Sequence, residues 1–597
     1  MQKKNLKTSL LLSCSFFFTV YAQGNEYNLN LSKDNLSWYW LGRLNWDSGW
    51  NSRSQFRITE QFNSNLFLGS SYGNKWRDEN NLNASWTYRL SETLGTASKL
   101  RSQTFSDENS FIKFSKHLLY QEVQYLPHPQ ITLLPGLGWT TEDIYKYRDQ
   151  GWYSHVGMKI KNYDLSGYIN NSDGFSSFYF FPDRKNQEHR YFISFRKAFS
   201  SLASDSIQVG YELVDNMYPL PPGSSSEDKI LEDVGINSRY LYNDLRYHFS
   251  KVTVFQVETK LQNRDITQSN PNLINHRQEL NYANRLSILY SGSRMTTYFA
   301  FNTAQITTLS SRRSGPSREA RTDIDGLQAA FHLRWGWKIS PADETSLNFS
   351  YTKYEYSSPD TTQGIDEDDV RFITDLDYSH RFSPYFLVKL KGNLYLYHQI
   401  YIFPTRSANN NWNRVYQFAT AFVHQVDDFF ENVYQLKILA NYTVYDFEEF
   451  LPEVRSYLFR KLIFTDTLRI TLSDGLKIQT LYQLEKEDNG TFFKELFAQQ
   501  VSRELLSHYL DIALIYVRIK GLEVSPAVNW YIRKEWNLMN QKNLVRDYLA
   551  FSPRISLSYT MGRHLNLYAS VAPRVYRDIN SAQQYFTIGR LNLKYVF

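Results

Sequence analysis

The sequence predicts an all-β chain that forms a single closed antiparallel transmembrane β-barrel. Three observations lead to this fold class. Apolar and polar side chains alternate over most of the length, short and long connections alternate, and the chain ends in an amphipathic run whose last residue is phenylalanine. Together they predict about 26 strands, within a range of roughly 24 to 28. Strands tilted by about 40° would then close to a backbone diameter of about 50 Å.

The alternation of side chains is clearest over residues 327–339, and residues 386–396 and 434–444 repeat it. These runs reach the about 9 to 11 residues that cross a bilayer, whereas strands of soluble sheets average about 5 to 6. The apolar residues predicted to face lipid are Leu327, Phe331, Leu333, Phe386, Val388, Leu390, Leu436, Ile438 and Leu565. The polar residues predicted to face the lumen are Arg334, Lys338, Lys389, Lys391 and Asn393.

The connections between these runs are of two kinds. Short turns, such as those at 340–343, 383–384, 427–428 and 473–475, recur roughly every 41 to 47 residues. The longer connections are rich in Pro, Ser, Asn and charge, and include 216–236, 308–322, 357–369, 403–413 and 446–455. Propeller blades also repeat at about 40 to 45 residues, but their connections are not so unequal. Short turns at one end and long loops at the other favour a membrane barrel.

The end of the chain resembles the C-terminal signature of bacterial outer-membrane proteins. Every second residue from 585 to 597 lies on one face, and Tyr595 and Phe597 complete it. The resemblance implies that the barrel-assembly machinery reads this last strand. It covers only these residues, and it agrees with the alternation found along the rest of the chain.

The beginning of the chain has the anatomy of a signal peptide over residues 1–22. Three lysines precede an apolar run over 9–20, and Ala22 supplies the small residue before the predicted cleavage point. A lipoprotein cleavage site at Cys14 is the alternative, but the apolar run continues past that cysteine. Export of this kind, together with the predicted barrel, predicts the outer membrane of a Gram-negative cell.

Beyond the signal peptide, the sequence predicts a short N-terminal segment over 23–36 and the barrel over 37–597. A segment this short is too small for a folded plug. We therefore expect the lumen to be closed by the chain's own loops or by another polypeptide, unless the barrel is flattened.

Composition excludes several function classes. With 66 Lys and Arg against 60 Asp and Glu, the charge balance gives no basis for nucleic-acid binding. Cys14 is the only cysteine, so the barrel region offers no thiolate metal site, haem attachment or cysteine nucleophile. No HExxH, GxSxG or Walker motif is present. We therefore expect neither an enzyme nor a cofactor.

Three weaker patterns have two interpretations each. The carboxylates of Asp366, Glu367, Asp368 and Asp369 could hold Ca²⁺, but a solvated acidic loop is simpler. Arg312, Arg313, Arg318 and Arg321 could contact the phosphates of lipid A, or could only keep a loop soluble. Residues 135–138, Pro-Gly-Leu-Gly, are interpreted as a turn rather than a phosphate cradle.

The leading hypothesis for function is a transport channel, or a sheath around a partner protein or an exported substrate. Its partners would be outer-membrane lipid and lipopolysaccharide, with a plug, lipoprotein or cytochrome in the lumen. A surface-exposed adhesion barrel is the alternative. An enzyme with its site on the rim is a third hypothesis, and the size of the chain argues against it.

Overall fold

The computed structural model describes residues 25–597, apart from 70–72, 111, 222–228, 272, 315–319, 322, 359–365, 451–454, 540 and 580. The predicted signal peptide over 1–22 lies outside these residues. Strands make up most of the described chain, and its one helix is the short 3₁₀ helix η1 (Ser407–Asn409). No helix in the described part of the chain is long and apolar enough to cross a membrane.

All the strands are antiparallel to their partners. The first fifteen are β1 (Glu26–Lys33), β2 (Ser37–Asn51), β3 (Ser54–Phe67), β4 (Lys75–Arg89), β5 (Leu94–Asp107), β6 (Ile112–His128), β7 (Ile131–Ile144), β8 (Tyr147–Leu165), β9 (Tyr168–Phe180), β10 (Lys185–Ala198), β11 (Ala203–Pro219), β12 (Leu231–His248), β13 (Thr253–Asn270), β14 (Leu273–Ser291) and β15 (Met295–Ser314). The others are β16 (Ala320–Arg321), β17 (Ile324–Lys338), β18 (Asp343–Ser357), β19 (Glu367–Ser383), β20 (Phe386–Tyr401), β21 (Asn411–Val426), β22 (Phe430–Tyr445), β23 (Tyr457–Ser473), β24 (Leu476–Phe493), β25 (Ala498–Ile519), β26 (Leu522–Asn537), β27 (Asn543–Met561), β28 (Leu565–Asp578) and β29 (Ser581–Val596).

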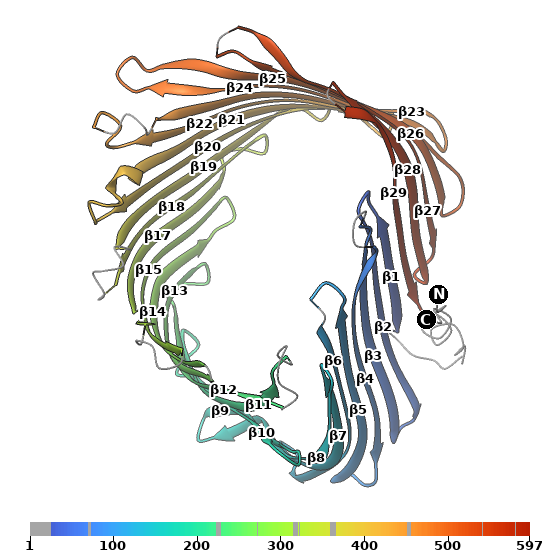
Figure 1. Cartoon of the computed structure of the whole chain (residues 1–597), viewed down its shortest axis with the longest axis vertical. Helices are drawn as coiled ribbons and strands as arrows, with labels where there is room; N and C mark the ends of the chain where they lie inside the picture. The colour runs from blue at the N-terminus through green and yellow to red at the C-terminus, as the bar shows by residue number, and fades with distance from the viewer. Residues whose placement is uncertain are drawn as a thin grey trace.

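The strands close into one ring that is longer than it is wide (Figure 1). Each strand pairs with its neighbours in sequence, and β1 pairs with β29 to complete the circuit. The two-residue β16 pairs only with the end of β15, so 28 of the 29 strands in the described chain form the wall. The predicted closed antiparallel barrel is confirmed, with a strand number at the upper end of the predicted range.

The first strand corrects the predicted start of the barrel. Residues 23–36 were expected to precede a barrel that begins at 37, but β1 lies in the wall, where Leu29 is opposite Gly42 of β2 and Leu593 of β29. Without β1, the edges of β2 and β29 would present unpaired backbone groups to lipid, and each such group costs several kcal/mol. This short strand therefore closes the ring.

The wall strands are longer than a bilayer requires. Apart from β1 and β16 they contain between 13 and 22 residues, whereas a tilted crossing needs about 9 to 11. The hairpins opposite the termini therefore continue as strands beyond the membrane, and the long connections predicted at 216–236, 308–322 and 357–369 are partly strand. Parts of these three connections lie outside the described residues.

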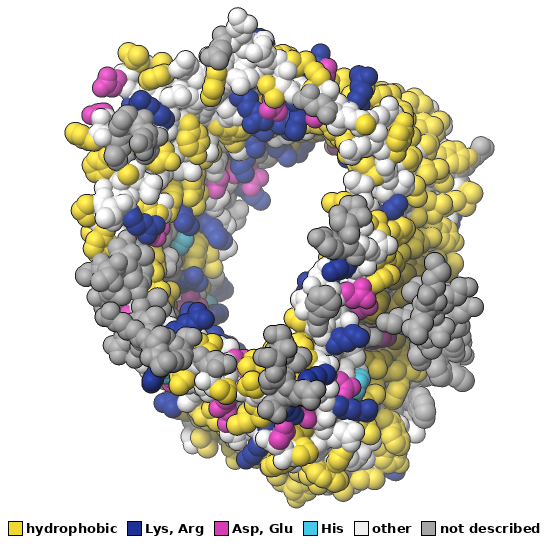
Figure 2. Space-filling view, in the orientation of Figure 1, with side chains coloured by type: hydrophobic (Ala, Val, Ile, Leu, Met, Phe, Trp, Pro, Cys, Tyr) yellow, Lys and Arg dark blue, Asp and Glu magenta, His cyan; other side chains and the backbone are white. Residues whose placement is uncertain are grey.

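The two faces of the wall differ as the alternation predicts. None of the nine residues predicted to face lipid is buried, and Leu327, Leu436 and Ile438 are 52%, 39% and 47% exposed. Figure 2 shows hydrophobic side chains on the outer flank and charged side chains along the central opening. A soluble sheet would bury the apolar face instead. This wall presents that face to its surroundings, as a protein surrounded by lipid must.

Candidate functional site

The polar face of β20 carries Lys389, Lys391 and Asn393. In the register with β19 these residues are opposite Ser379, Asp377 and Asp375 respectively. The Asn393 side-chain amide donates to Asp375 Oδ1 over 2.6 Å, and Lys391 Nζ lies 3.7 Å from Asp377 Oδ1. The polar face that these two strands share is therefore a mixed array of charged and amide side chains.

The same polar face on β17 carries Arg334 and Lys338. The Arg334 guanidinium carbon lies 5.9 Å from the ring centroid of Tyr298 on β15, and Lys338 is opposite Glu344 in the register with β18. Charged side chains of both signs line the opening in Figure 2. A wall of this kind holds water and ions rather than an apolar core.

The ring bends sharply at β7 to β10, at one end of its long axis (Figure 1). A sharp bend crowds the side chains on its concave face, and here β7 has Gly136 and Gly138. A Cβ atom on Gly136 would lie 2.1 Å from His155 Cε1, and one on Gly138 would lie 2.3 Å from the backbone oxygen of Leu119. Only glycine permits such close approach.

These glycines also correct a prediction. Residues 135–138 were interpreted as a turn, but they lie inside β7, paired with β6 and β8. They mark a close approach of neighbouring strands, which is the other common reason for glycine within a strand.

Three tyrosines pack on the concave face of the bend. The ring centroids of Tyr120 and Tyr153 are 5.3 Å apart, and those of Tyr153 and Tyr179 are 4.9 Å apart. Tyr153 is 1% exposed and forms a small cluster with Leu118 and Tyr120. The bend therefore has a packed aromatic core on the inner side of the wall.

A buried charge group adjoins these rings. Glu122 accepts from Lys99 Nζ over 2.7 Å, and its second oxygen lies 3.1 Å from His155 Nε2. Glu122 and His155 are 4% and 2% exposed. A buried carboxylate needs a cation and further hydrogen bonds, and these two partners supply both. His155 Nδ1 is buried without a hydrogen-bond partner among the described residues.

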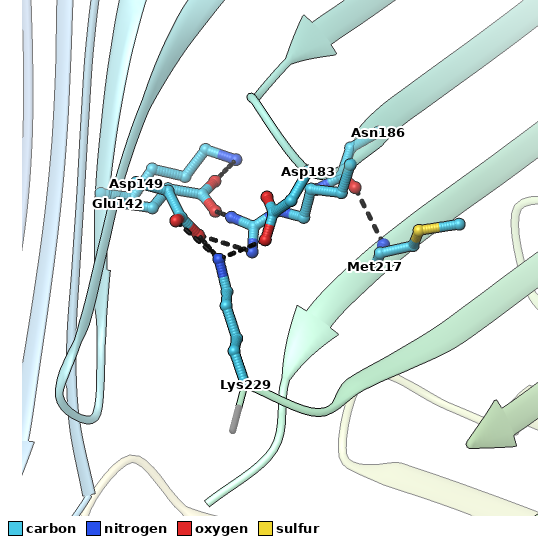
Figure 3. A network of polar contacts seen from close by, with 8 residues as sticks. Glu142, Asp149, Asp183, Asn186, Met217 and Lys229 are labelled. Atoms are coloured by element: carbon cyan, nitrogen blue, oxygen red, sulfur yellow. Dashed lines mark hydrogen bonds and ion pairs between the residues drawn. The ribbon is translucent and has the colours of Figure 1, made fainter. Parts of the chain in front are cut away.

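A larger ion-pair network lies beside this group, at the end of the barrel that carries the long connections (Figure 3). At its centre is Arg184, whose side chain is 0% exposed. Its guanidinium lies 2.6 Å from Glu142 Oε2 and 2.9 Å from Asp149 Oδ2. Lys116 Nζ contacts the other oxygen of Glu142 at 2.6 Å and lies 4.1 Å from the Tyr179 ring centroid.

The network continues into the β11–β12 connection through Lys229. Its ammonium group lies 2.6 Å from Asp149 Oδ1 and 2.7 Å from Asp183 Oδ2. Nearby, the backbone N–H of Met217 on β11 donates to Asn186 Oδ1 over 2.8 Å. Segments that are far apart in sequence are thus tied together: β6, β7, β8, the β9–β10 connection and the end of the β11–β12 connection.

The network is balanced, with three cations and three carboxylates, each in contact with an opposite charge. Such mutual pairing leaves no free nucleophile or base, so the arrangement is suited to anchoring the rim. The part of the chain that the structure describes contains no group of three His, Cys, Asp or Glu side chains placed to hold a metal ion.

The acidic run is not assembled into one site. Glu367, Asp368 and Asp369 lie in β19, where successive side chains point to opposite faces, so Asp368 is separated from its neighbours. Asp366 precedes the strand and accepts a hydrogen bond from the backbone N–H of Ser358 over 2.7 Å. Strand geometry therefore does not bring the four carboxylates together, and the predicted acidic loop is partly strand.

The arginine cluster is only partly described. Arg312 and Arg313 are exposed, consecutive residues near the end of β15, and their side chains point to opposite faces of the strand. Arg321 belongs to β16, and Arg318 lies outside the described residues. Contact of this cluster with lipid-A phosphates stays a prediction.

The predicted assembly signal lies at the seam of the ring. The Phe597 backbone N–H donates to the carbonyl oxygen of Asn25 over 2.9 Å, and Tyr595 is opposite Tyr27 on β1. The Tyr595 and Phe597 ring centroids are 4.8 Å apart. The last strand thus closes the barrel, and its reading by the assembly machinery stays a prediction.

Sequence reasoning missed the residues of the bend. Glu122, Glu142, His155 and Arg184 come from separate strands or connections, and no local motif joins them. A usable signal did exist in β7: Gly136, Gly138, Thr140 and Glu142 share one parity, so small residues and a carboxylate occupy the face opposite Leu137 and Trp139.

No family model matches the sequence, and no curated protein matches it either. Among solved structures, the copper transporter OprC has 9% identity and a TM-score of 0.41, over 96% of this chain and 80% of that one. The siderophore receptor PiuA from Acinetobacter baumannii has 9% identity and a TM-score of 0.40, over 97% and 82%. The siderophore receptor PirA from Pseudomonas aeruginosa has 8% identity and a TM-score of 0.34, over 92% and 80%.

The membrane assignment follows from the barrel itself. A closed ring leaves no unpaired edge, its outer face is apolar, and its inner face is charged. Backbone groups in a bilayer can be satisfied only within helices or within such a closed barrel. The chain is a large β-barrel of the Gram-negative outer membrane.

Proposed function

We propose that this chain is a transport barrel, a wide aqueous conduit for hydrophilic cargo across the outer membrane. The observation that carries the proposal is the opening in Figure 2, which passes through the ring between walls of charged side chains. Lys389, Lys391 and Asn393 belong to the polar face of that wall. Charged residues facing a lumen are costly unless water or a polar cargo is present.

The width of the ring supports a large cargo. A barrel with 28 wall strands has a mean backbone diameter of about 55 Å at ordinary spacing and tilt, whereas aqueous porins have about 16 to 18 strands. A lumen of this size could surround a polypeptide such as a plug, a lipoprotein or a cytochrome. The ion-pair network around Arg184 supports a lumen that a polypeptide can occupy, because it holds Lys229, at the end of the β11–β12 connection, against the wall.

Conductance of the purified full chain in planar bilayers tests the proposal. A single-channel conductance larger than that of a porin measured in parallel is the expected result, and it would show that the chain alone leaves its lumen open. A small, selective conductance would mean that the loops constrict the pore, and the idea of a lumen partner would then be wrong. A folded barrel that inserts without carrying current would contradict the conduit.

A further inference from the structure

A second region of the inner wall carries a line of aromatic rings across β26 to β29. The ring centroids of Tyr531 and Tyr548 are 5.8 Å apart, those of Tyr548 and Tyr576 are 5.7 Å apart, and those of Tyr576 and Phe586 are 5.6 Å apart. One ring comes from each of four adjacent strands. All four side chains are half-buried, so part of each ring is open to the lumen.

The register places these rings on the inner face. Tyr548 shares its parity in β27 with the buried Ala550 and Ser552, whereas Phe551 and Ile555 on the opposite face are 37% and 56% exposed. The apolar, exposed side is the lipid side by the pattern of the whole wall. The line of rings therefore faces the lumen.

Arginines accompany the rings. The arginine–tyrosine strip is defined here as the four rings together with Arg503, Arg533, Arg546, Arg554 and Arg574. Three carboxylates pair with these arginines. Glu535 pairs with both Arg503 and Arg533. Asp511 pairs with Arg554, and Asp578 pairs with Arg546. Five arginines against three carboxylates leave an excess of two positive charges.

Arg574 is the arginine of the strip that is best able to bind a further anion. Its guanidinium carbon lies 5.6 Å from the Phe586 ring centroid, and no ion pair with a carboxylate of the described residues engages it. The Nε atoms of Arg533, Arg554 and Arg574 are buried without hydrogen-bond partners in the described chain. A buried Nε is closed to a ligand, so the terminal nitrogens of the Arg574 guanidinium are the donors that can match a carboxylate.

We propose that the arginine–tyrosine strip binds an acidic oligosaccharide as it passes through the lumen. The inference deepens the proposed conduit function and rests on it. The apolar faces of sugar rings pack on aromatic rings, and three of the four rings carry a hydroxyl that can bond to sugar hydroxyls. The uronate or other acid groups of the chain would pair with the guanidinium of Arg574 and with the excess charge around it.

A nucleic acid is the other polymer that combines rings with negative charge, and the strip fits it less well. Neighbouring rings are inclined to one another by 63°, 33° and 71°, so they offer no set of parallel platforms for successive bases. An excess of two positive charges is also small for a backbone with one phosphate per nucleotide.

The test uses the full chain in detergent micelles, with titration of three probes: a linear oligouronate, a neutral glucan oligomer of equal length, and a homopolymeric oligonucleotide. Calorimetry should show binding of the oligouronate that is at least about tenfold tighter than that of the neutral oligomer, as expected for a charge-assisted contact. Tighter binding of the oligonucleotide would reassign the strip, and equal binding of the two sugars would refute the role of its charge.

Variants locate the site. Arg574→Gln and Tyr548→Ala should each weaken oligouronate binding by about tenfold. The matched controls are Arg371→Gln and Tyr397→Ala, which alter a guanidinium and a ring 5.4 Å apart on β19 and β20, outside the strip. The controls should leave the affinity within about twofold of the parent chain. If Arg574→Gln does not fold, Arg574→Lys keeps the charge but loses bidentate pairing, and it should also bind more weakly.

Conductance and oligouronate binding together distinguish failure of the proposed binding strip from failure of the proposed conduit. A conducting barrel that binds no oligouronate, or whose binding ignores the strip variants, overturns the strip alone. Binding that depends on Arg574 in a barrel without conductance overturns the conduit and leaves the strip as a surface for acidic sugar chains.

Discussion

Gly136 and His155 face each other on neighbouring strands at a distance that leaves no room for a side-chain atom on the glycine. A Cβ atom there would lie 2.1 Å from His155 Cε1. The imidazole cannot easily retreat, since it is 2% exposed and its Nε2 lies 3.1 Å from Glu122. This close contact lies within the sharp bend of the barrel.

The first prediction follows from that contact. Gly136→Ala should destabilise the folded barrel by about 1 to 3 kcal/mol, because overpacking must displace either the ring or a strand. Gly392→Ala is the matched control, since a Cβ atom at that strand position meets nothing within 4 Å. Urea unfolding followed by gel mobility of unheated samples measures the difference. Equal stability of the two variants would contradict the close packing.

The second prediction concerns the centre of the ion-pair network. Arg184→Ala removes the buried cation that Glu142 and Asp149 share, while Lys116 and Lys229 still contact these carboxylates. We therefore expect a loss of about 3 kcal/mol in the free energy of unfolding, the low end of the range for breaking a buried pair. Arg57→Ala is the control: its ion pair with Asp47 is exposed at the surface, and such pairs contribute about 0 to 1 kcal/mol. The same urea titration compares the two variants. A small effect of Arg184→Ala would show that the network does not stabilise the rim.

The third prediction tests the lipid face. Leu436→Arg places a charge on the outer side of β22, at a cost of about 2 to 4 kcal/mol near the middle of the bilayer. Lys437→Arg changes the neighbouring residue on the opposite face, keeps its charge, and should be nearly neutral. Folding into lipid vesicles from urea reports both values. If the two substitutions cost the same, the assignment of faces to this strand is wrong.

The fourth prediction tests the wall of the conduit. Replacement of Lys389 and Lys391 by glutamate makes the lumen more negative, so permeation should shift towards cations. The reversal potential in a salt gradient measures the shift. Lys251→Glu combined with Lys520→Glu makes the same charge change in two exposed turns, and it should have a smaller effect. A larger shift in the turn variant would place the selective region at the mouth and not on β20.

The fifth prediction concerns closure of the ring. Deletion of Phe597 removes the N–H that donates to Asn25 and the ring that packs on Tyr595. We expect a lower yield of folded barrel in the outer membrane, seen as loss of heat-modifiable mobility on a gel. A conservative change in the exposed β1–β2 turn, Asn35→Ser, should leave the yield unchanged. Equal yields from all three chains would show that the terminal residue carries no assembly signal.

The sequence by itself determined the class of the fold and the faces of its strands. Side chains of a strand alternate with a period of two residues whatever the register. Leu436 and Lys437 can therefore be assigned to opposite faces of their strand before its neighbouring strands are known. Long external connections and short turns follow from the same local reading, since proline, serine and charge mark exposed chain. These features need no knowledge of distant contacts.

Only the tertiary structure decided how the ring closes, where it bends and which charges meet. β1 belongs to the barrel wall because it pairs with the edges of β2 and β29. These two edges face each other only once the whole sheet has formed. Lys116, Glu142, Arg184 and Lys229 span more than a hundred residues, and their contact requires both register and curvature. Because curvature arises from packing among several strands, the parity pattern within β7 does not show which residues of other strands it meets, and the residues of the arginine–tyrosine strip come from separate strands that no local motif joins.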